Sequence, residues 1–177
     1  MPKPCMLLFV DAVAFAAAKH RTQRRKDVEA SPYINHPIAL AHVLAFEAQV
    51  SDEHVLAAAM LHDTLEDTQT SFAELKQRFG LAIAKTVAEV TDDKTLPKRT
   101  RKALQIEHAP HLSKRAKLVK LADKICNLRD VAANPPRDWP LWRRRKYFDW
   151  AKQVVDGLRG VHPRLEAIFD DTYAARP

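Results

Sequence analysis

Every periodic stretch of this 177-residue chain repeats its apolar residues at helical spacing. No stretch alternates strictly between apolar and polar side chains, as a half-buried strand does, and runs of β-branched residues are absent. We therefore expect an all-α fold: a compact helical bundle of about eight to ten helices, organised as a single domain over residues 1–177.

Capping residues and prolines place the boundaries of the expected helices. Ser71, followed by Glu74, has the signature of a capping box, and Ser51 and Ser113 are expected to cap two further helices. Pro37 suits the first turn of a helix, where a missing N–H group costs little. The expected helices cover approximately residues 7–21, 37–48, 51–65, 71–80, 81–90, 98–108, 113–133, 141–158 and 164–175.

Glycine and charge content limit the classes of function. Only three glycines occur, which excludes a glycine-rich phosphate-binding loop. The formal net charge is +7, and basic residues concentrate at positions 19–26 and 143–146. Such a balance suits a polyanionic partner, either nucleic acid, a membrane surface or a highly phosphorylated small molecule. Because no recognition-helix signature accompanies the basic clusters, a non-enzymatic nucleic-acid-binding protein is the less favoured alternative.

The cysteines and the apolar N-terminal run indicate the compartment. Cys5 and Cys126 lack the spacing of a metal site, and so sparse a pair fits a reducing cytoplasm. The apolar run at residues 5–10 is too short to span a membrane, and we interpret it as the beginning of a helix rather than a cleaved signal. We expect a cytoplasmic protein without a membrane partner. The sequence does not decide whether the protein forms a homodimer.

An acidic cluster with one histidine closes the helix expected at residues 51–65. His62 and Glu66 are four residues apart, and so are Asp63 and Asp67. If the helix continues through this turn, all four side chains project from one side. Burying three carboxylates beside an imidazole is costly unless a cation compensates. The alternative is a surface helix end with solvated acids.

Two other segments offer partners for this cluster. His36 stands just before the helix start at Pro37, where the backbone is rigid. Lys120, Asp123 and Asn127 share one stripe of the long helix, and apolar sequence neighbours around Asp123 weaken a solvated-face interpretation. Two imidazoles and two carboxylates with open positions suit Mn²⁺, Fe²⁺ or a labile Zn²⁺. An open position lets the metal hold a water molecule and lower its pKa.

This ordered set of residues resembles the HD superfamily of metal-dependent phosphohydrolases. The chain resembles the hydrolase domain of RelA/SpoT proteins in three runs: Tyr-Ile-Asn-His-Pro at 33–37, His-Asp-Thr-Leu-Glu-Asp-Thr at 62–68 and Val-Lys-Leu-Ala-Asp-Lys at 119–124. Two stretches, at 89–98 and 147–158, are similar to the stand-alone small alarmone hydrolases, the group that includes the metazoan SpoT homologue. The resemblance extends from about residue 12 to residue 158.

The resemblance implies an HD-domain helical bundle and a metal-dependent (p)ppGpp 3′-pyrophosphohydrolase, which acts on the alarmone of the stringent response to give GDP or GTP. It implies one Mn²⁺ ion, with other divalent metals able to replace it, held by His36, His62, Asp63 and Asp123. It assigns Glu66 and Asp67 as the catalytic pair that activates water. It assigns substrate binding to Arg25, Lys26, Lys98, Asn127 and Tyr147. An HD-type enzyme acting on another nucleotide, such as the 2′-phosphate of NADPH, is the alternative.

Overall fold

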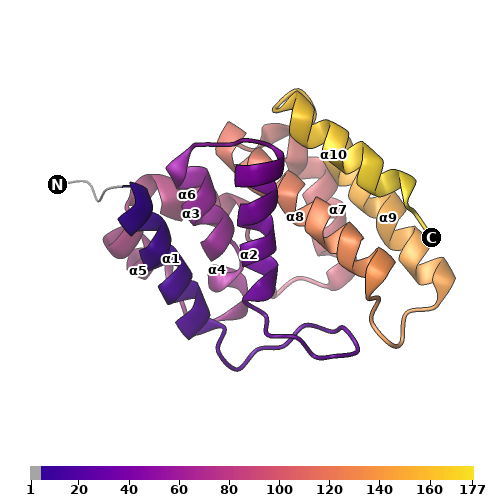
Figure 1. Cartoon of the computed structure of the whole chain (residues 1–177), viewed down its shortest axis with the longest axis horizontal. Helices are drawn as coiled ribbons and strands as arrows, with labels where there is room; N and C mark the ends of the chain where they lie inside the picture. The colour runs from indigo at the N-terminus through magenta and orange to yellow at the C-terminus, as the bar shows by residue number, and fades with distance from the viewer. Residues whose placement is uncertain (1–4) are drawn as a thin grey trace.

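The computed structural model describes residues 5–177 and confirms the all-α prediction for that part of the chain (Figure 1). The helices are α1 (Cys5–Lys19), α2 (Asn35–His42), α3 (Glu53–Leu61), α4 (Thr64–Asp67), α5 (Phe72–Phe79), α6 (Leu81–Val90), α7 (Lys98–His108), α8 (Lys114–Ala133), α9 (Leu141–Asp156) and α10 (Pro163–Ala174). Val43–Glu47 forms a π-helical turn, and Ala109–His111 a 3₁₀ turn. Within residues 5–177, β pairing is confined to one isolated bridge between Arg24 and Pro32.

The long helix α8 lies at the centre of the bundle, packed against α2, α3, α6, α9 and α10. Its inward side chains recur at helical spacing, and Leu121, Ile125 and Leu128 are fully buried. Cys126 is also buried as a free thiol, whereas the side chain of Cys5 lies outside the described residues. Because α8 carries the core, polar side chains on its other stripe are held in fixed positions.

The helix expected at residues 37–48 begins earlier and does not stay α-helical. α2 begins at Asn35, so Pro37 is still within its first turn, where no N–H bond is lost. The chain then widens into the π-helical turn, closed by a 2.8 Å bond from the Ala48 N–H to the Val43 carbonyl. His36 is thus the second residue of a helix rather than the residue before one.

The single helix expected at residues 51–65, capped by Ser51, is wrong. Asp52 is the cap, and its side chain accepts from the His54 N–H at 2.9 Å. α3 ends at Leu61, where the Thr64 hydroxyl donates to the Leu61 carbonyl at 2.7 Å and so competes with the helical ladder. The chain resumes as α4, with His62 and Asp63 on the break between the two helices.

Two other predicted caps are confirmed. The Ser71 side chain accepts from the Glu74 N–H at 3.1 Å, and Ser113 caps α8. Gly80 ends α5 with a φ of +87°, a conformation that favours glycine. The capping box is only half formed, because the Glu74 carboxylate pairs with Lys19 at 2.9 Å and thereby ties α5 to α1.

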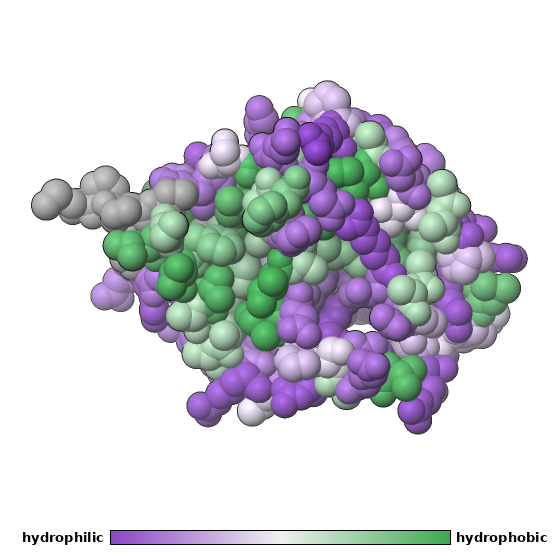
Figure 2. Space-filling model, viewed as in Figure 1, coloured by the Kyte–Doolittle hydropathy of each residue, from purple (hydrophilic) through white to green (hydrophobic). Residues whose placement is uncertain are grey.

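Loops that follow α1 and α8 lie along the same side of the bundle (Figure 1). Figure 2 shows a hydrophilic hollow beside the loop after α1, whereas an apolar patch covers α1 itself. Across the described residues, none of the helices is long and apolar enough to cross a membrane. The hollow, rather than the apolar patch, leads to the polar residues singled out from the sequence.

Candidate metal centre and active site

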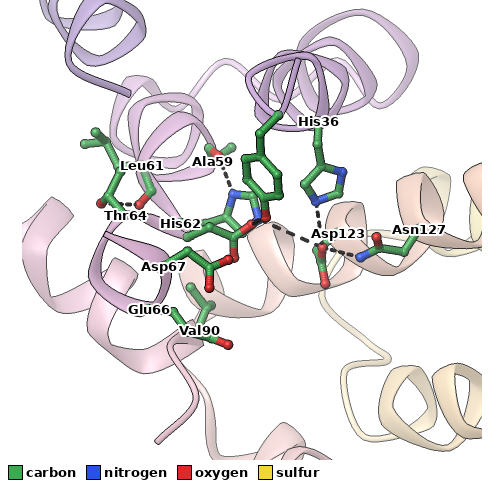
Figure 3. Close-up of polar contacts among 12 residues, drawn as sticks. His36, Ala59, Leu61, His62, Thr64, Glu66, Asp67, Val90, Asp123 and Asn127 are labelled. Atoms are coloured by element: carbon green, nitrogen blue, oxygen red, sulfur yellow. Dashed lines mark hydrogen bonds and ion pairs between the residues drawn. The ribbon is translucent and has the colours of Figure 1, made fainter. Parts of the chain in front are cut away.

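Side chains from three parts of the bundle meet at one point, with both imidazoles buried and Asp123 half-buried (Figure 3). His36 of α2 reaches Asp123 of α8, with 3.2 Å between Nε2 and Oδ1. His62, after α3, places its Nε2 at 3.9 Å from the same oxygen, so the three ligand atoms lie within 4.8 Å of one another. The carboxylate of Asp63 adjoins them, with Oδ2 at 2.8 Å from His62 Nε2. The structure therefore brings together all four side chains predicted as metal ligands.

The surroundings of the His62 imidazole give the clearest sign that the site suits a cation. Its Nδ1 lies 2.8 Å from the Ala59 carbonyl, which only accepts hydrogen bonds, so Nδ1 carries the proton. Its Nε2 is buried without a hydrogen-bond partner and faces the carboxylates of Asp63 and Asp123. Two carboxylates held beside a buried imidazole nitrogen are costly without a compensating cation, either a proton or a metal ion. These residues fit a divalent metal ion with open coordination positions.

The pKa values of these side chains also indicate that the site suits a cation. Burial lowers the pKa of His36 and keeps its imidazole in the neutral form that binds metals. Burial also lowers the pKa of His62, but the charges of Asp63 and Asp123 outweigh it and raise that pKa to about 9. Burial alone would raise the pKa of Asp123, yet Lys124 and His36 hold it well below its usual range. In the metal-free protein, a proton on His62 thus stands where a cation would bind.

Neighbouring side chains orient the carboxylates. The Tyr33 hydroxyl donates to Asp63, and Asn127 donates to Asp123 at 2.6 Å between Nδ2 and Oδ1. Lys124 donates to the other oxygen of Asp123 at 3.1 Å. Such outer partners hold metal ligands in place. Sequence reasoning missed the roles of Tyr33 and Lys124, although both lie in the runs that carry the family resemblance.

Glu66 and Asp67 project from α4 on the His62 side of the centre (Figure 3). Glu66 Oε2 accepts from the Asp92 N–H at 3.0 Å, and burial raises the pKa of its carboxyl despite that bond. The Asp67 carboxylate pairs with Lys94, and the Asp67 backbone carbonyl accepts a hydrogen bond from Gln23 Nε2 at 2.6 Å. A carboxylate with a raised pKa beside a metal centre suits proton transfer.

Two adjoining cavities extend from the metal centre. The inner one, about 230 Å³, is lined by the four predicted metal ligands together with Glu66 and Asp67. The outer one, about 320 Å³, opens at the loop after α1 and contains Lys26. Arg25, Asn127 and Tyr147 line both, so the two cavities form one cleft. One end of this cleft is lined by the predicted metal ligands, and the other end is basic and aromatic.

The predicted substrate-binding residues are not all in the cleft. Arg25 lines it, but its guanidinium pairs with Asp130 and donates to Asn127 Oδ1 at 3.3 Å. Lys98 lines neither cavity. Burial lowers the pKa of Lys98, and the nearby charges of Arg143 and Lys26 lower it further. Four of the five residues therefore share the cleft, and Lys98 lies outside its lining, near the charges of Lys26 and Arg143.

Trp139 is a cleft residue that the sequence did not reveal. Its ring lies 5.5 Å from the Tyr147 ring, and the Arg143 guanidinium stands 4.6 Å from the Trp139 ring centre. Only a weak signal was present: Trp139 and Tyr147 flank the start of α9, next to the basic cluster at 143–146. Trp139 of the wall of the outer cavity thus comes from the connection between α8 and α9, and Tyr147 comes from α9 itself.

Comparisons with known proteins agree with this geometry. The family model described as HD domain matches residues 12–146. A guanosine-3′,5′-bis(diphosphate) 3′-pyrophosphohydrolase, MESH1, of Xenopus tropicalis is 54% identical over 166 residues, which cover 94% of this chain and 93% of that protein. The human MESH1 is 53% identical over 167 residues, with 94% and 93% covered. A solved structure, described as a metazoan ortholog of SpoT that hydrolyses ppGpp, superposes with a TM-score of 0.93 at 49% identity and covers 99% of this chain and 97% of that one.

Proposed function

The chain belongs to the HD-domain family, and on that premise we propose that it is a metal-dependent guanosine-3′,5′-bis(diphosphate) 3′-pyrophosphohydrolase. The observation that carries the proposal is the buried Nε2 of His62 between the carboxylates of Asp63 and Asp123, at the closed end of a cleft whose open end is basic. A nucleotide bearing a pyrophosphate on its ribose is complementary to both ends. The alarmone, ppGpp or pppGpp, is then the substrate, and GDP or GTP and pyrophosphate are the products.

We further propose Mn²⁺ as the metal, one ion per chain. His36, His62, Asp63 and Asp123 would hold it, since a mixed imidazole and carboxylate set with open positions suits this ion. When bound, the ion lowers the pKa of a water molecule and neutralises phosphate charge. The fixed tautomer of His62 and the hydrogen bonds on both carboxylates support a site that is organised before metal binding.

Glu66 and Asp67 serve as the catalytic pair in this proposal. Glu66 accepts a proton from the attacking water, a role that its raised pKa favours near neutral pH. The water oxygen bonds to the phosphorus that is attached to the ribose 3′ oxygen, and the bond between this phosphorus and the 3′ oxygen breaks. The proton taken up by Glu66 passes to the 3′ oxygen, which leaves as a hydroxyl, while pyrophosphate keeps the oxygen of the water. Asp67 orients the water from the same short helix. Lys94 pairs with the Asp67 carboxylate and Gln23 donates to its backbone carbonyl, so these two contacts hold Asp67 in place.

The basic and aromatic end of the cleft would bind the rest of the nucleotide. Lys26 and Lys98 supply positive charge at the rim, and Arg25 is held in orientation by its contacts with Asp130 and Asn127. Tyr147 offers an aromatic surface for the base or a hydroxyl for a phosphate.

Three further expectations from the sequence stay predictions: the cytoplasmic location, the single domain over 1–177, and the lack of a nucleic-acid or membrane partner.

Product analysis in ¹⁸O-labelled water tests this proposal. Attack at the 3′-phosphorus predicts that one ¹⁸O atom enters pyrophosphate and none enters GDP, as read by mass spectrometry. Release of orthophosphate, or label in GDP, would contradict the proposed reaction. NADPH incubated in parallel tests the alternative substrate. If its 2′-phosphate is removed faster than pyrophosphate is removed from the alarmone, NADPH is favoured as the substrate.

A further inference from the structure

The carboxylate of Glu66 depends on the turn that follows α6. The backbone N–H of Asp92, in this turn, donates to Glu66 Oε2 at 3.0 Å. On the other side, Arg101 of α7 places a guanidinium nitrogen at 3.6 Å from Oε1, too far for a hydrogen bond. The Asp92 N–H therefore supplies the hydrogen bond that orients Glu66, and its position depends on what holds the turn.

Lys120 of α8 holds the turn from within the protein. Its Nζ donates to the Val90 carbonyl at 2.9 Å and lies 3.9 Å from Asp92 Oδ1. The residue is only 8% exposed, and burial together with the nearby charge of Lys124 lowers the pKa of its ammonium. A buried ammonium is costly, and apolar residues flank it on the inward face of α8. Packing alone would be served better by an apolar side chain at this position.

Gln105 of α7 fixes the same turn from a third element. Its side-chain Nε2 donates to Asp92 Oδ2 at 2.6 Å. Asp92 is thus held by α7 through a hydrogen bond and lies close to the ammonium on α8, while its own N–H points at Glu66. Lys120 and Gln105 both line the inner cavity that contains the predicted metal ligands. Their hydrogen bonds go to the Val90–Asp92 turn.

We propose that Lys120 is a positioning residue for hydrolysis, which holds the Val90–Asp92 turn so that the Asp92 N–H orients the Glu66 carboxylate. The inference rests on the proposed function, because it concerns the residue assigned there as the proton acceptor. Small displacements of a catalytic group cost large factors in rate while leaving substrate binding almost unchanged. Lys120 therefore acts on kcat and not on KM or metal binding.

The test replaces Lys120 with an apolar side chain of similar length. In Lys120→Met, kcat for guanosine tetraphosphate with Mn²⁺ should fall by about 10- to 100-fold, with KM and the bound Mn²⁺ per chain unchanged within about twofold. Lys114→Met, at the exposed start of the same helix, is the matched control and should keep the wild-type kcat. Gln105→Leu removes the second anchor and should lower kcat in the same way, which covers the case in which Lys120→Met does not fold.

A second readout needs no turnover. In the metal-free protein, hydrogen exchange of the Asp92 amide should be at least about tenfold faster in Lys120→Met than in wild type, because the amide loses its fixed acceptor. Under single-turnover conditions with enzyme in excess, adding Lys120→Met to Glu66→Ala should lower the residual rate less than about twofold, since the two residues act together.

Three results would overturn the inference: wild-type kcat in both folded variants, unchanged exchange at Asp92, or an undiminished loss in the Glu66→Ala background. If instead the wild-type chain leaves guanosine tetraphosphate intact, the proposed function fails. The exchange at Asp92 then still decides whether Lys120 holds the turn, so the two failures are distinguishable.

Discussion

Single residues of the metal centre stand out in the sequence because each is a polar side chain in an apolar context. His62 and Asp63 close an Ala- and Leu-rich helix, and Asp123 lies among leucine and alanine. Tyr33 and Lys124 could not be assigned in the same way. Tyr33 contacts Asp63 from a distant loop, a relation that no local spacing records. Lys124 is adjacent to Asp123, but a lysine beside an aspartate on a helix is too common to indicate a contact.

Removing a metal ligand should remove the metal and the activity together. His62→Ala and Asp123→Ala each take away one of the predicted ligands, so bound Mn²⁺ measured by mass spectrometry should fall from about one per chain to near zero. His42→Ala, with a side chain 61% exposed and outside the centre, is the control. Full metal occupancy in His62→Ala would show that the ion binds elsewhere.

Removing Glu66 should separate metal binding from turnover. Glu66→Ala keeps the four predicted ligands, so Mn²⁺ should stay bound, while kcat should fall by about 10²- to 10⁴-fold because the proposed proton acceptor is lost. Glu107→Ala, on the exposed surface of α7, should behave as wild type. Turnover that survives in Glu66→Ala would contradict the assignment of this carboxylate.

The stability of the metal-free protein should depend on His62. Its pKa in the folded state, about 9, is above the value near 6.5 of an unfolded histidine. The protonated form therefore stabilises the fold fully below pH 6.5, and this contribution is lost as the pH rises to 9. Urea unfolding with EDTA should give a free energy of unfolding about 2 kcal/mol lower at pH 9 than at pH 6.5. The same loss in His62→Ala would assign the effect to another group.

At the scale of elements, caps and apolar periodicity predicted most helices to within a few residues, and α5 and α8 begin at the serines expected to cap them. The break between α3 and α4 was missed, because His62 and Asp63 are both compatible with a continuous helix. What breaks the helix is the Thr64 hydroxyl on the Leu61 carbonyl, a competition that helix propensity does not express. The break aims His62 and Asp63 at α8, so the error concerned the part of the fold that builds the site.

The packing of α9 gives a test of the core. Phe148 is fully buried, whereas Trp142 on the same helix is 65% exposed. Phe148→Ala should lower the free energy of unfolding by about 3–5 kcal/mol, because a large cavity replaces the ring. Trp142→Ala should change it by less than about 0.5 kcal/mol. Urea unfolding of both variants measures the difference, and equal losses would contradict the burial of this helix face.

At the scale of the whole molecule, part of the excess positive charge, which is +7 in total, lies at the outer cavity, where Arg24, Arg25 and Lys26 are found. Burial lowers the pKa of Lys98, and the charges of Arg143 and Lys26, which lines the outer cavity, stand close enough to lower it further. The sequence predicted a polyanionic partner but left its class open, since charge alone does not report shape. The cleft supplies the shape: a metal centre at one end and aromatic rings with cations at the other favour a phosphorylated nucleotide over an extended polymer.

Titration of the metal-free protein with Mn²⁺, in the presence of guanosine tetraphosphate, tests the account most directly. Pyrophosphate release should rise in proportion to added Mn²⁺ and level off near one ion per chain, because one centre holds the metal that the reaction needs. Chelation by EDTA should abolish the release again. Intact guanosine tetraphosphate in a sample shown to hold one Mn²⁺ per chain would contradict the central claim.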